Sequence, residues 1–154
     1  MQSWVNGQPA SALASLKDRG LAYGDGLFET IAVKAGQPLL LDLHLQRLAH
    51  GCSRLAMAAD HTLIRSELLA YAQAMGEGVL KLILTRGDSL RGYSFTAEAQ
   101  PRRILQASPA AAYPEAYGAH GVQLFDCATR LAEQPLLAGL KHLNRLEQVI
   151  ARSE

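Results

Sequence analysis

Three segments of the chain are rich in β-branched, aromatic and alternating apolar residues, which is typical of β-strands. They cover residues 27–33, 79–85 and 103–107. The Asn6-Gly7 pair lies between short extended pieces at residues 4–8 and predicts a tight hairpin. Ala35-Gly36 predicts a second turn, after which the chain returns through residues 38–41. The pattern therefore predicts an antiparallel sheet.

Two segments have the apolar spacing of amphipathic helices. The first has apolar residues three or four positions apart: Leu41, Leu45, Leu48, Cys52 and Leu55. Asp42 is its predicted N-cap, because a short side chain that accepts hydrogen bonds stabilises a helix start. The second helix is predicted from about Thr62 to Met75 and ends at Gly76 and Gly78.

The chain divides into one complete unit and the beginning of another. Residues 1–108 form the predicted N-terminal α+β domain, and the Pro- and Ala-rich residues 109–120 are the predicted linker. Residues 121–154 contain a predicted strand at 122–126 and a helix that begins near His142. Because one strand and one helix are too small to form a core, we expect an incomplete second domain.

Composition excludes several classes of protein. The 154 residues include 15 Lys and Arg against 14 Asp and Glu, so the net charge of +1 argues against binding to nucleic acid. Arginines outnumber lysines eleven to four, which favours small anionic ligands. Cys52 and Cys127 have no metal-site or disulfide spacing, so no metal is expected. No signal peptide or membrane span is readable, and a cytoplasmic protein is expected.

Two cationic side chains are candidates for chemistry. Lys141 follows an apolar segment, residues 135–140. Burial of the side chain there would favour the neutral amine that a nucleophile or base requires. Arg47 lies one turn after His44 on the first helix, where it could bind a phosphate with two parallel hydrogen bonds. The alternative for each is an ordinary solvated side chain on an amphipathic helix.

Two loops have residues that could bind a ligand. Residues 23–30 contain closely spaced glycines, but Glu29 replaces the third glycine of a dinucleotide fingerprint and a strand follows, so a phosphate cradle is rejected. The loop that contains Arg86, Arg91, Tyr93 and Ser94 is rich in donors and suits a substrate carboxylate. An ordinary solvated loop is the alternative.

Taken together, these motifs resemble the fold-type IV pyridoxal-phosphate enzymes. That family includes branched-chain aminotransferases, D-amino-acid aminotransferases and aminodeoxychorismate lyases. The matching segments are residues 18–20, 23–30, 44–48, 86–94 and 141–149. The last segment, KHLNRLEQV, is preceded by Leu-Ala-Gly-Leu and resembles the lyase branch.

The resemblance implies individual roles. Lys141 would be the Schiff-base lysine that holds pyridoxal 5'-phosphate, and Arg47 would contact the phosphate of this cofactor. Arg91 and Tyr93 would recognise the substrate carboxylates. Asn144 matches a position shared with the D-amino-acid branch and would also contact substrate.

The implied fold is the family's N-terminal small α+β domain, an antiparallel sheet with two helices, plus the opening strand and helix of a truncated second domain. The implied reaction converts 4-amino-4-deoxychorismate into 4-aminobenzoate and pyruvate in folate biosynthesis. Lys141 would act as general base, and Thr30 is a candidate proton donor. Branched-chain enzymes have a tyrosine at the position of Arg145, which argues against that substrate class.

Two other functions stay open. An aminotransferase of the same fold would use Lys141 identically, and a non-catalytic fragment would only dimerise. The resemblance implies a homodimer and a small-molecule substrate. Members of the family have a complete second domain that carries an acidic partner for the pyridine nitrogen, whereas residues 121–154 correspond only to the beginning of that domain. We therefore expect a fragment of a lyase that binds the cofactor weakly by itself.

Overall fold

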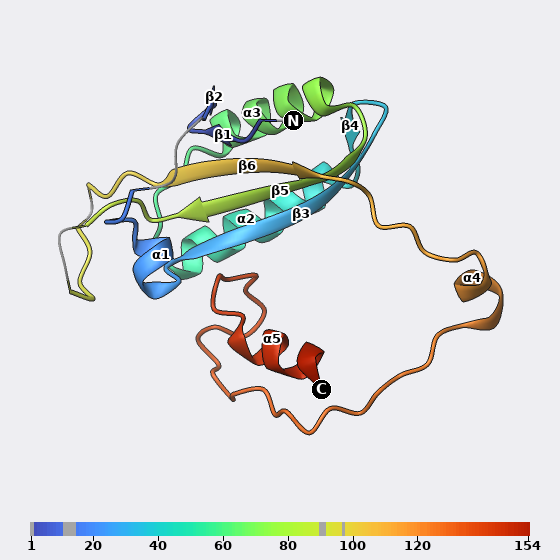
Figure 1. The fold of residues 1–154 in the computed structure, drawn as a ribbon. Helices are drawn as coiled ribbons and strands as arrows, with labels where there is room; N and C mark the ends of the chain where they lie inside the picture. Colours follow the sequence, from blue (N-terminus) through green and yellow to red (C-terminus); the bar gives the residue numbers. More distant parts are fainter. Residues whose placement is uncertain (1, 11–14, 90–91, 97) are drawn as a thin grey trace.

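The computed structural model describes residues 2–10, 15–89, 92–96 and 98–154. Its central feature is a six-stranded antiparallel sheet with the strand order β2-β1-β6-β5-β3-β4 (Figure 1). The strands are β1 (Trp4–Val5), β2 (Gln8–Pro9), β3 (Gly26–Lys34), β4 (Gln37–Pro38), β5 (Gly78–Thr85) and β6 (Arg102–Ser108). The predicted antiparallel α+β fold is confirmed.

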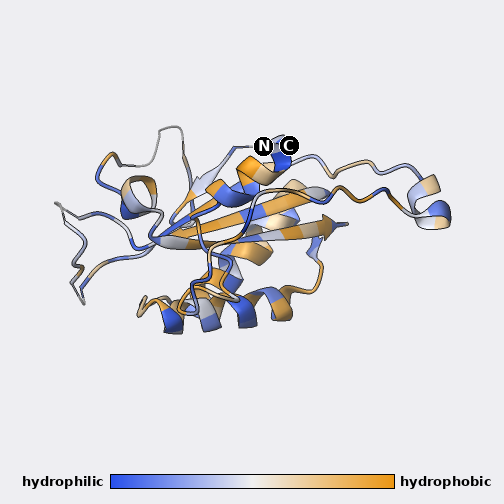
Figure 2. Cartoon of the chain, turned by 90° about the horizontal axis from the view of Figure 1, so that it is seen from below, coloured by the Kyte–Doolittle hydropathy of each residue, from blue (hydrophilic) through white to orange (hydrophobic). Residues whose placement is uncertain are grey.

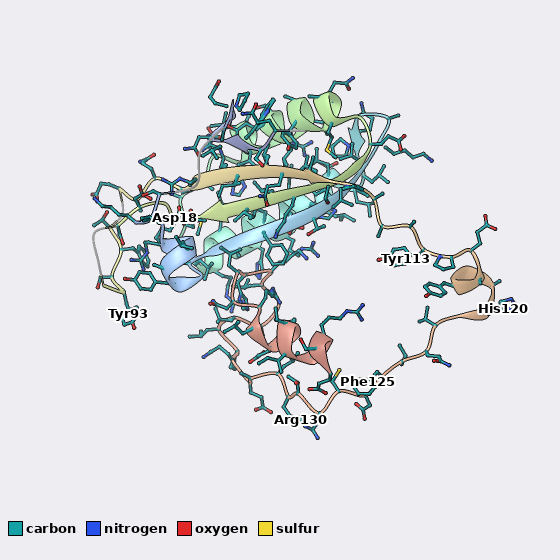
Figure 3. The ribbon with its side chains drawn as sticks, viewed as in Figure 1. Asp18, Tyr93, Tyr113, His120, Phe125 and Arg130 are labelled. Atoms are coloured by element: carbon teal, nitrogen blue, oxygen red, sulfur yellow. The ribbon has the colours of Figure 1, made fainter. Side chains whose placement is uncertain are left out.

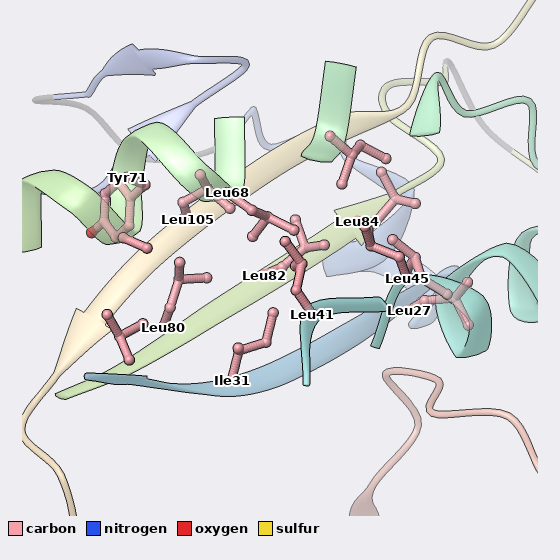
Figure 4. Packing of buried hydrophobic residues seen from close by; sticks show 14 of the residues in the cluster. Leu27, Ile31, Leu41, Leu45, Leu68, Tyr71, Leu80, Leu82, Leu84 and Leu105 are labelled. Carbon is pink, nitrogen blue, oxygen red and sulfur yellow. The ribbon is translucent and has the colours of Figure 1, made fainter. Parts of the chain in front are cut away.

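Two long helices pack against one face of this sheet. They are α2 (Leu41–Arg54), which contacts β3, and α3 (His61–Met75), which contacts β4, β5 and β6. Buried leucines from the three long strands and from both helices meet in the core between these layers (Figure 4). The helical ribbons alternate between hydrophobic and hydrophilic residues, as expected for helices with one buried face (Figure 2).

The predicted hairpin between β1 and β2 forms at Asn6 and Gly7. Both residues have positive φ, 50° and 77°, which is the requirement of the turn that matches the twist of the flanking strands. The second hairpin also forms, but its return strand β4 is limited to Gln37–Pro38. Leu40 follows with a φ of 54°, a left-handed conformation that turns the chain into α2.

Two helix starts differ from the sequence prediction. The prediction of Asp42 as N-cap is wrong, because α2 begins at Leu41 and Leu40 occupies the cap position. Asp42 instead accepts a hydrogen bond from Arg65 of α3. The residues before β3 form a short helix that the sequence did not predict, α1 (Arg19–Tyr23), whose first backbone N–H groups donate to the side chain of Asp18.

After β6 the chain leaves the sheet as a long exposed segment, called the exposed excursion below, and returns to the edge of β3 near Lys141. Tyr113, His120, Phe125 and Arg130 lie along it, at a distance from Asp18 and Tyr93 at the other end of the sheet (Figure 3). The excursion contains the short helix α4 (Ala116–His120). The strand predicted at residues 122–126 does not form, because no strand in the described part of the chain lies beside these exposed residues. The predicted final helix forms later than expected, as α5 (Leu146–Ser153).

None of the helices within the described ranges is both long enough and apolar enough to cross a membrane.

Candidate active site

The segment that carries Lys141 is attached to one edge of β3 by backbone hydrogen bonds. The N–H of Phe28 donates to the carbonyl of Lys141 at 2.9 Å, and the N–H of Leu143 donates to the carbonyl of Gly26 at 3.0 Å. Strand β4 pairs only with the other end of β3 and leaves this part of the edge accessible. A residue late in the chain is thereby placed beside the start of an early strand.

Lys141 lines a pocket of about 840 Å³ at this edge. The pocket also contains Phe28 from β3, Arg47 from α2, Arg145 and, from α5, Arg152. One lysine and three arginines therefore share a single hollow. An excess of fixed positive charge in a partly apolar pocket favours a small anion.

The amine of Lys141 is held in an environment that favours its neutral form. Its pKa is lowered, first because burial removes water from the ammonium and then because Arg47, Arg145 and Lys81 repel it. The carboxylate of Glu29 opposes this and raises the pKa. A lower pKa increases the fraction of neutral amine near pH 7, which is the form that attacks a carbonyl carbon.

Arg47 is fixed by a buried carboxylate. Its Nε donates to Oε1 of Glu29 at 2.8 Å and its Nη2 donates to Oε2 at 2.5 Å, while Glu29 is only 1% exposed. Nδ1 of His44 lies 2.7 Å from the same Oε2. The hydrogen bonds to Glu29 raise the pKa of Arg47 despite an opposing effect of burial. Arg47 therefore stays charged, and its orientation is set by a bidentate contact.

Thr30 directly follows Glu29 in β3 and lies opposite Lys81 in the neighbouring strand, β5. Glu29 is buried against α2 whereas Thr30 is exposed, so the two side chains point to opposite faces of the strand as the alternation predicts. Of the two, neither is among the described residues that line the pocket.

A second cluster of charges joins the segment before β3 to the segment after β5. Oδ2 of Asp25 accepts hydrogen bonds from Nε of Arg19 and Nε of Arg86, both at 2.8 Å. These arginines are 3% and 4% exposed. Burial raises the pKa of Asp25, but the hydrogen bonds from Arg86 and Arg19 outweigh burial and leave the pKa below its ordinary value. The carboxylate therefore stays ionised between two buried cations.

Arg86 is turned into the protein rather than toward a substrate. Its Nη1 and Nη2 donate to the carbonyls of Ala56 and Leu55 at 3.0 and 2.8 Å. The sequence prediction that Arg86 belongs to a loop that binds a carboxylate is therefore wrong for this residue. The arginine instead joins β5 to the end of α2.

Tyr93 is held in place by its backbone. Its carbonyl accepts a hydrogen bond from Nη2 of Arg19 at 2.8 Å, and its exposed ring lies 5.5 Å from the ring of Tyr23. Asn144 is exposed and contacts Gly24, where φ is +66° and an added Cβ would collide with Oδ1 of Asn144. Arg91 lies outside the described residues.

Four contributors to the site were not identified from the sequence. They are Phe28, whose ring lies under the Lys141 amine, Glu29, which holds Arg47, Arg145, whose guanidinium faces the same ring, and Arg152, which lines the pocket from α5. The alternation along β3 places Phe28 on the face opposite the core, and this pattern could have identified it from the sequence. The pairing of Glu29 with Arg47 could not be identified in this way, because the two residues meet only when α2 packs on the sheet.

Comparisons with known proteins identify the family of the chain. Residues 26–154 match the model of the family described as amino-transferase class IV. The matched region includes β3, α2 and the whole Lys141 segment. The chain belongs to the class IV aminotransferase family of enzymes.

Among its relatives, the chain is similar to an aminodeoxychorismate lyase from Vibrio harveyi, with 37% identity over 98% of this chain and 56% of the relative. It is similar to the crystal structure of 4-amino-4-deoxychorismate lyase from Pseudomonas aeruginosa, with 65% identity and a TM-score of 0.95 over 99% of this chain and 56% of that one. A hypothetical aminotransferase from Mycobacterium tuberculosis in a PLP-bound form has 26% identity and a TM-score of 0.60 over 71% of this chain and 39% of that one. The chain thus spans about half the length of the lyases it matches.

Proposed function

We propose that this protein acts as a pyridoxal-phosphate-dependent lyase that converts 4-amino-4-deoxychorismate into 4-aminobenzoate and pyruvate. The observation that carries the proposal is the shared pocket of Lys141 and Arg47. The similarity to lyases at 37% and 65% identity supports this substrate in preference to an amino acid.

The residues present fit the cofactor. Its aldehyde requires an amine that is neutral near pH 7, and burial lowers the pKa of Lys141 toward that condition. Its phosphate requires a fixed cation, and Arg47 is charged and held by Glu29. In the described part of the chain, these contacts use Nε and Nη2 of Arg47 and leave Nη1 for an anion.

Each residue then has a role. Lys141 would hold the cofactor through Nζ, and the same atom would accept the proton of the substrate C–H group next to the amine. Arg47 binds the phosphate. When bound, pyridoxal phosphate supplies an electron sink for that C–H bond. Arg91, Tyr93 and Asn144 are proposed to contact substrate, and Thr30 is the proposed donor of the proton that completes pyruvate.

The proposal extends to the assembly and the location of the protein. We propose a homodimer, as in the family that it resembles, and a cytoplasmic enzyme of folate biosynthesis. Size-exclusion chromatography with light scattering measures the mass directly. A mass of one chain at all concentrations in the micromolar range contradicts the dimer.

The decisive experiment is covalent trapping. Incubation with pyridoxal phosphate followed by borohydride reduction is expected to place a pyridoxyl group on Lys141, which peptide mapping by mass spectrometry locates. The other lysines, Lys17, Lys34 and Lys81, serve as internal controls for random modification. Uniform labelling of all four lysines, or labelling that spares Lys141, defeats the proposal.

The reaction type is tested with substrates. A lyase releases 4-aminobenzoate and pyruvate from aminodeoxychorismate without any keto acid present. The similarity to an aminotransferase supports one alternative, in which a D-amino acid and a keto acid exchange the amine. Product analysis with each substrate set separates the two, and exchange without 4-aminobenzoate formation contradicts the lyase.

Replacement of Arg47 is expected to weaken the binding of pyridoxal phosphate, because it removes the contact with the phosphate group and no other contact with the cofactor. Arg47→Gln is expected to lower the affinity for pyridoxal phosphate by about 10- to 100-fold, the usual value of a charge-assisted hydrogen bond. Binding of pyridoxal, which has no phosphate, is expected to change little. Absorbance titration measures both, and Arg65→Gln is the control because Arg65 pairs with Asp42 on the surface. An equal loss for both compounds contradicts the phosphate contact.

A further inference from the structure

Three cations from different parts of the chain surround the ring of Phe28. The Nζ atom of Lys141 lies 4.3 Å from the ring centroid, Nζ of Lys81 in β5 lies 5.6 Å away, and the guanidinium carbon of Arg145 lies 5.5 Å away. A cation within about 6 Å of an aromatic face is attracted by the negative charge of that face. Lys141 is the nearest of the three.

The same phenylalanine also fixes the backbone of Lys141. Its N–H donates to the Lys141 carbonyl at 2.9 Å, so the main chain and the amine of the lysine contact one residue. The backbone contact is independent of the side chain at position 28. A substitution there can therefore remove the ring and leave the attachment of the segment to β3 intact.

We propose that Phe28 is a positioning residue for Lys141, whose ring face holds the amine at the wall of the pocket. The inference deepens the proposed function, since it concerns the same lysine. Without the ring, the long side chain would be free to rotate away from Arg47 and Arg145. Both arginines line the pocket and repel the ammonium.

The charge of the amine reflects all the groups that face it. Glu29 attracts the ammonium, whereas Arg47, Arg145 and Lys81 repel it and burial disfavours it. The ring of Phe28 adds an attraction that operates only on the charged form. Replacement of the ring by an apolar side chain of similar size keeps the burial and removes this attraction, so the pKa of Lys141 is expected to fall.

The test observes the lysine directly and needs no cofactor. Reductive ¹³C-methylation of the full chain labels its lysines, and NMR reports the position and the titration of each dimethylamino group. Lys141→Arg assigns the Lys141 signal. In the wild type this signal is expected upfield of that of Lys34, because the ring current of Phe28 shields it.

Phe28→Leu is expected to abolish the upfield displacement and to lower the titration midpoint of Lys141 by about 0.4 to 1.5 pH units. Phe28→Tyr retains a ring and is expected to keep both properties, and Lys34 is expected to be unchanged throughout. Circular dichroism establishes that each variant is folded.

The outcomes separate the two proposals. A wild-type Lys141 signal that coincides with that of Lys34, or a signal unchanged by Phe28→Leu, overturns the role of Phe28. Failure of pyridoxal phosphate to label Lys141, with the NMR result as expected, defeats the proposed function and leaves the contact with Phe28 established.

Discussion

Lys141→Ala is expected to reduce the turnover of aminodeoxychorismate by at least about a thousand-fold. The substitution removes both the amine that holds the cofactor and the base that accepts the substrate proton, and a positioned base alone contributes about a hundred- to ten-thousand-fold. Folding should be little affected, because Lys141 contributes its backbone to the contact with β3. Steady-state kinetics measures the loss.

Two comparisons make this expectation specific. Lys34→Ala is the matched control, since Lys34 is an exposed lysine at the far end of the same strand, β3, and should retain full activity. A small primary amine added to Lys141→Ala is expected to restore part of the turnover by replacing the missing base. Undiminished turnover in Lys141→Ala contradicts the assignment of the lysine.

The sheet and its helices could be predicted from the sequence because their signals are local. Alternation along β3 separates a buried face, which includes Ile31 and Val33, from the face of Phe28 and Thr30. The Asn6-Gly7 turn has the one conformation that this pair favours. Each of these features depends on neighbours in the chain, so a pattern of a few residues is sufficient.

The differences arise where distant residues decide the structure. Residues 122–126 have a strand composition, but a strand needs a partner, and the exposed excursion provides none among the described residues. The short helix α1 is stabilised by Asp18, and Asp18 is held in turn by hydrogen bonds from Thr85 and Arg102 on two strands. A five-residue helix that depends on such contacts has no clear periodicity.

The same limit applies to the site. Lys141 and Arg47 were found through motifs, and they lie in one pocket. The contacts that prepare them for chemistry, from Phe28 and Glu29, are made across secondary-structure elements that come together only in the fold. Motif resemblance therefore identifies candidate reactive groups, whereas their charge and orientation follow from the tertiary structure.

Asp25→Ala is expected to destabilise the protein by about 3–5 kcal/mol. The substitution leaves two buried arginines without their shared carboxylate, and loss of one partner from a buried ion pair costs this amount because the remaining charge is unpaired. Arg19 retains carbonyl partners in residues 92–94, and Arg86 retains those of Leu55 and Ala56, but no anion remains between them. Urea unfolding followed by circular dichroism measures the loss.

Asp42→Ala is the matched control, because it also removes the carboxylate of an ion pair with an arginine. Asp42 and Arg65 are both exposed on the surface, where such pairs contribute at most about 1 kcal/mol. An equal penalty for the two variants would contradict the role assigned to burial.

The pH dependence gives an independent test of the same carboxylate. The pKa of Asp25 is lower in the folded protein than the value of about 3.9 expected in the unfolded chain. Its contribution is therefore fully present above the unfolded pKa and is lost as the pH falls through the folded pKa. The difference in unfolding free energy between the wild type and Asp25→Ala is expected to be constant from pH 7 to about pH 5 and to shrink below about pH 4. A difference that stays constant to pH 2 would mean that the ionised carboxylate is not what joins Arg19 to Arg86.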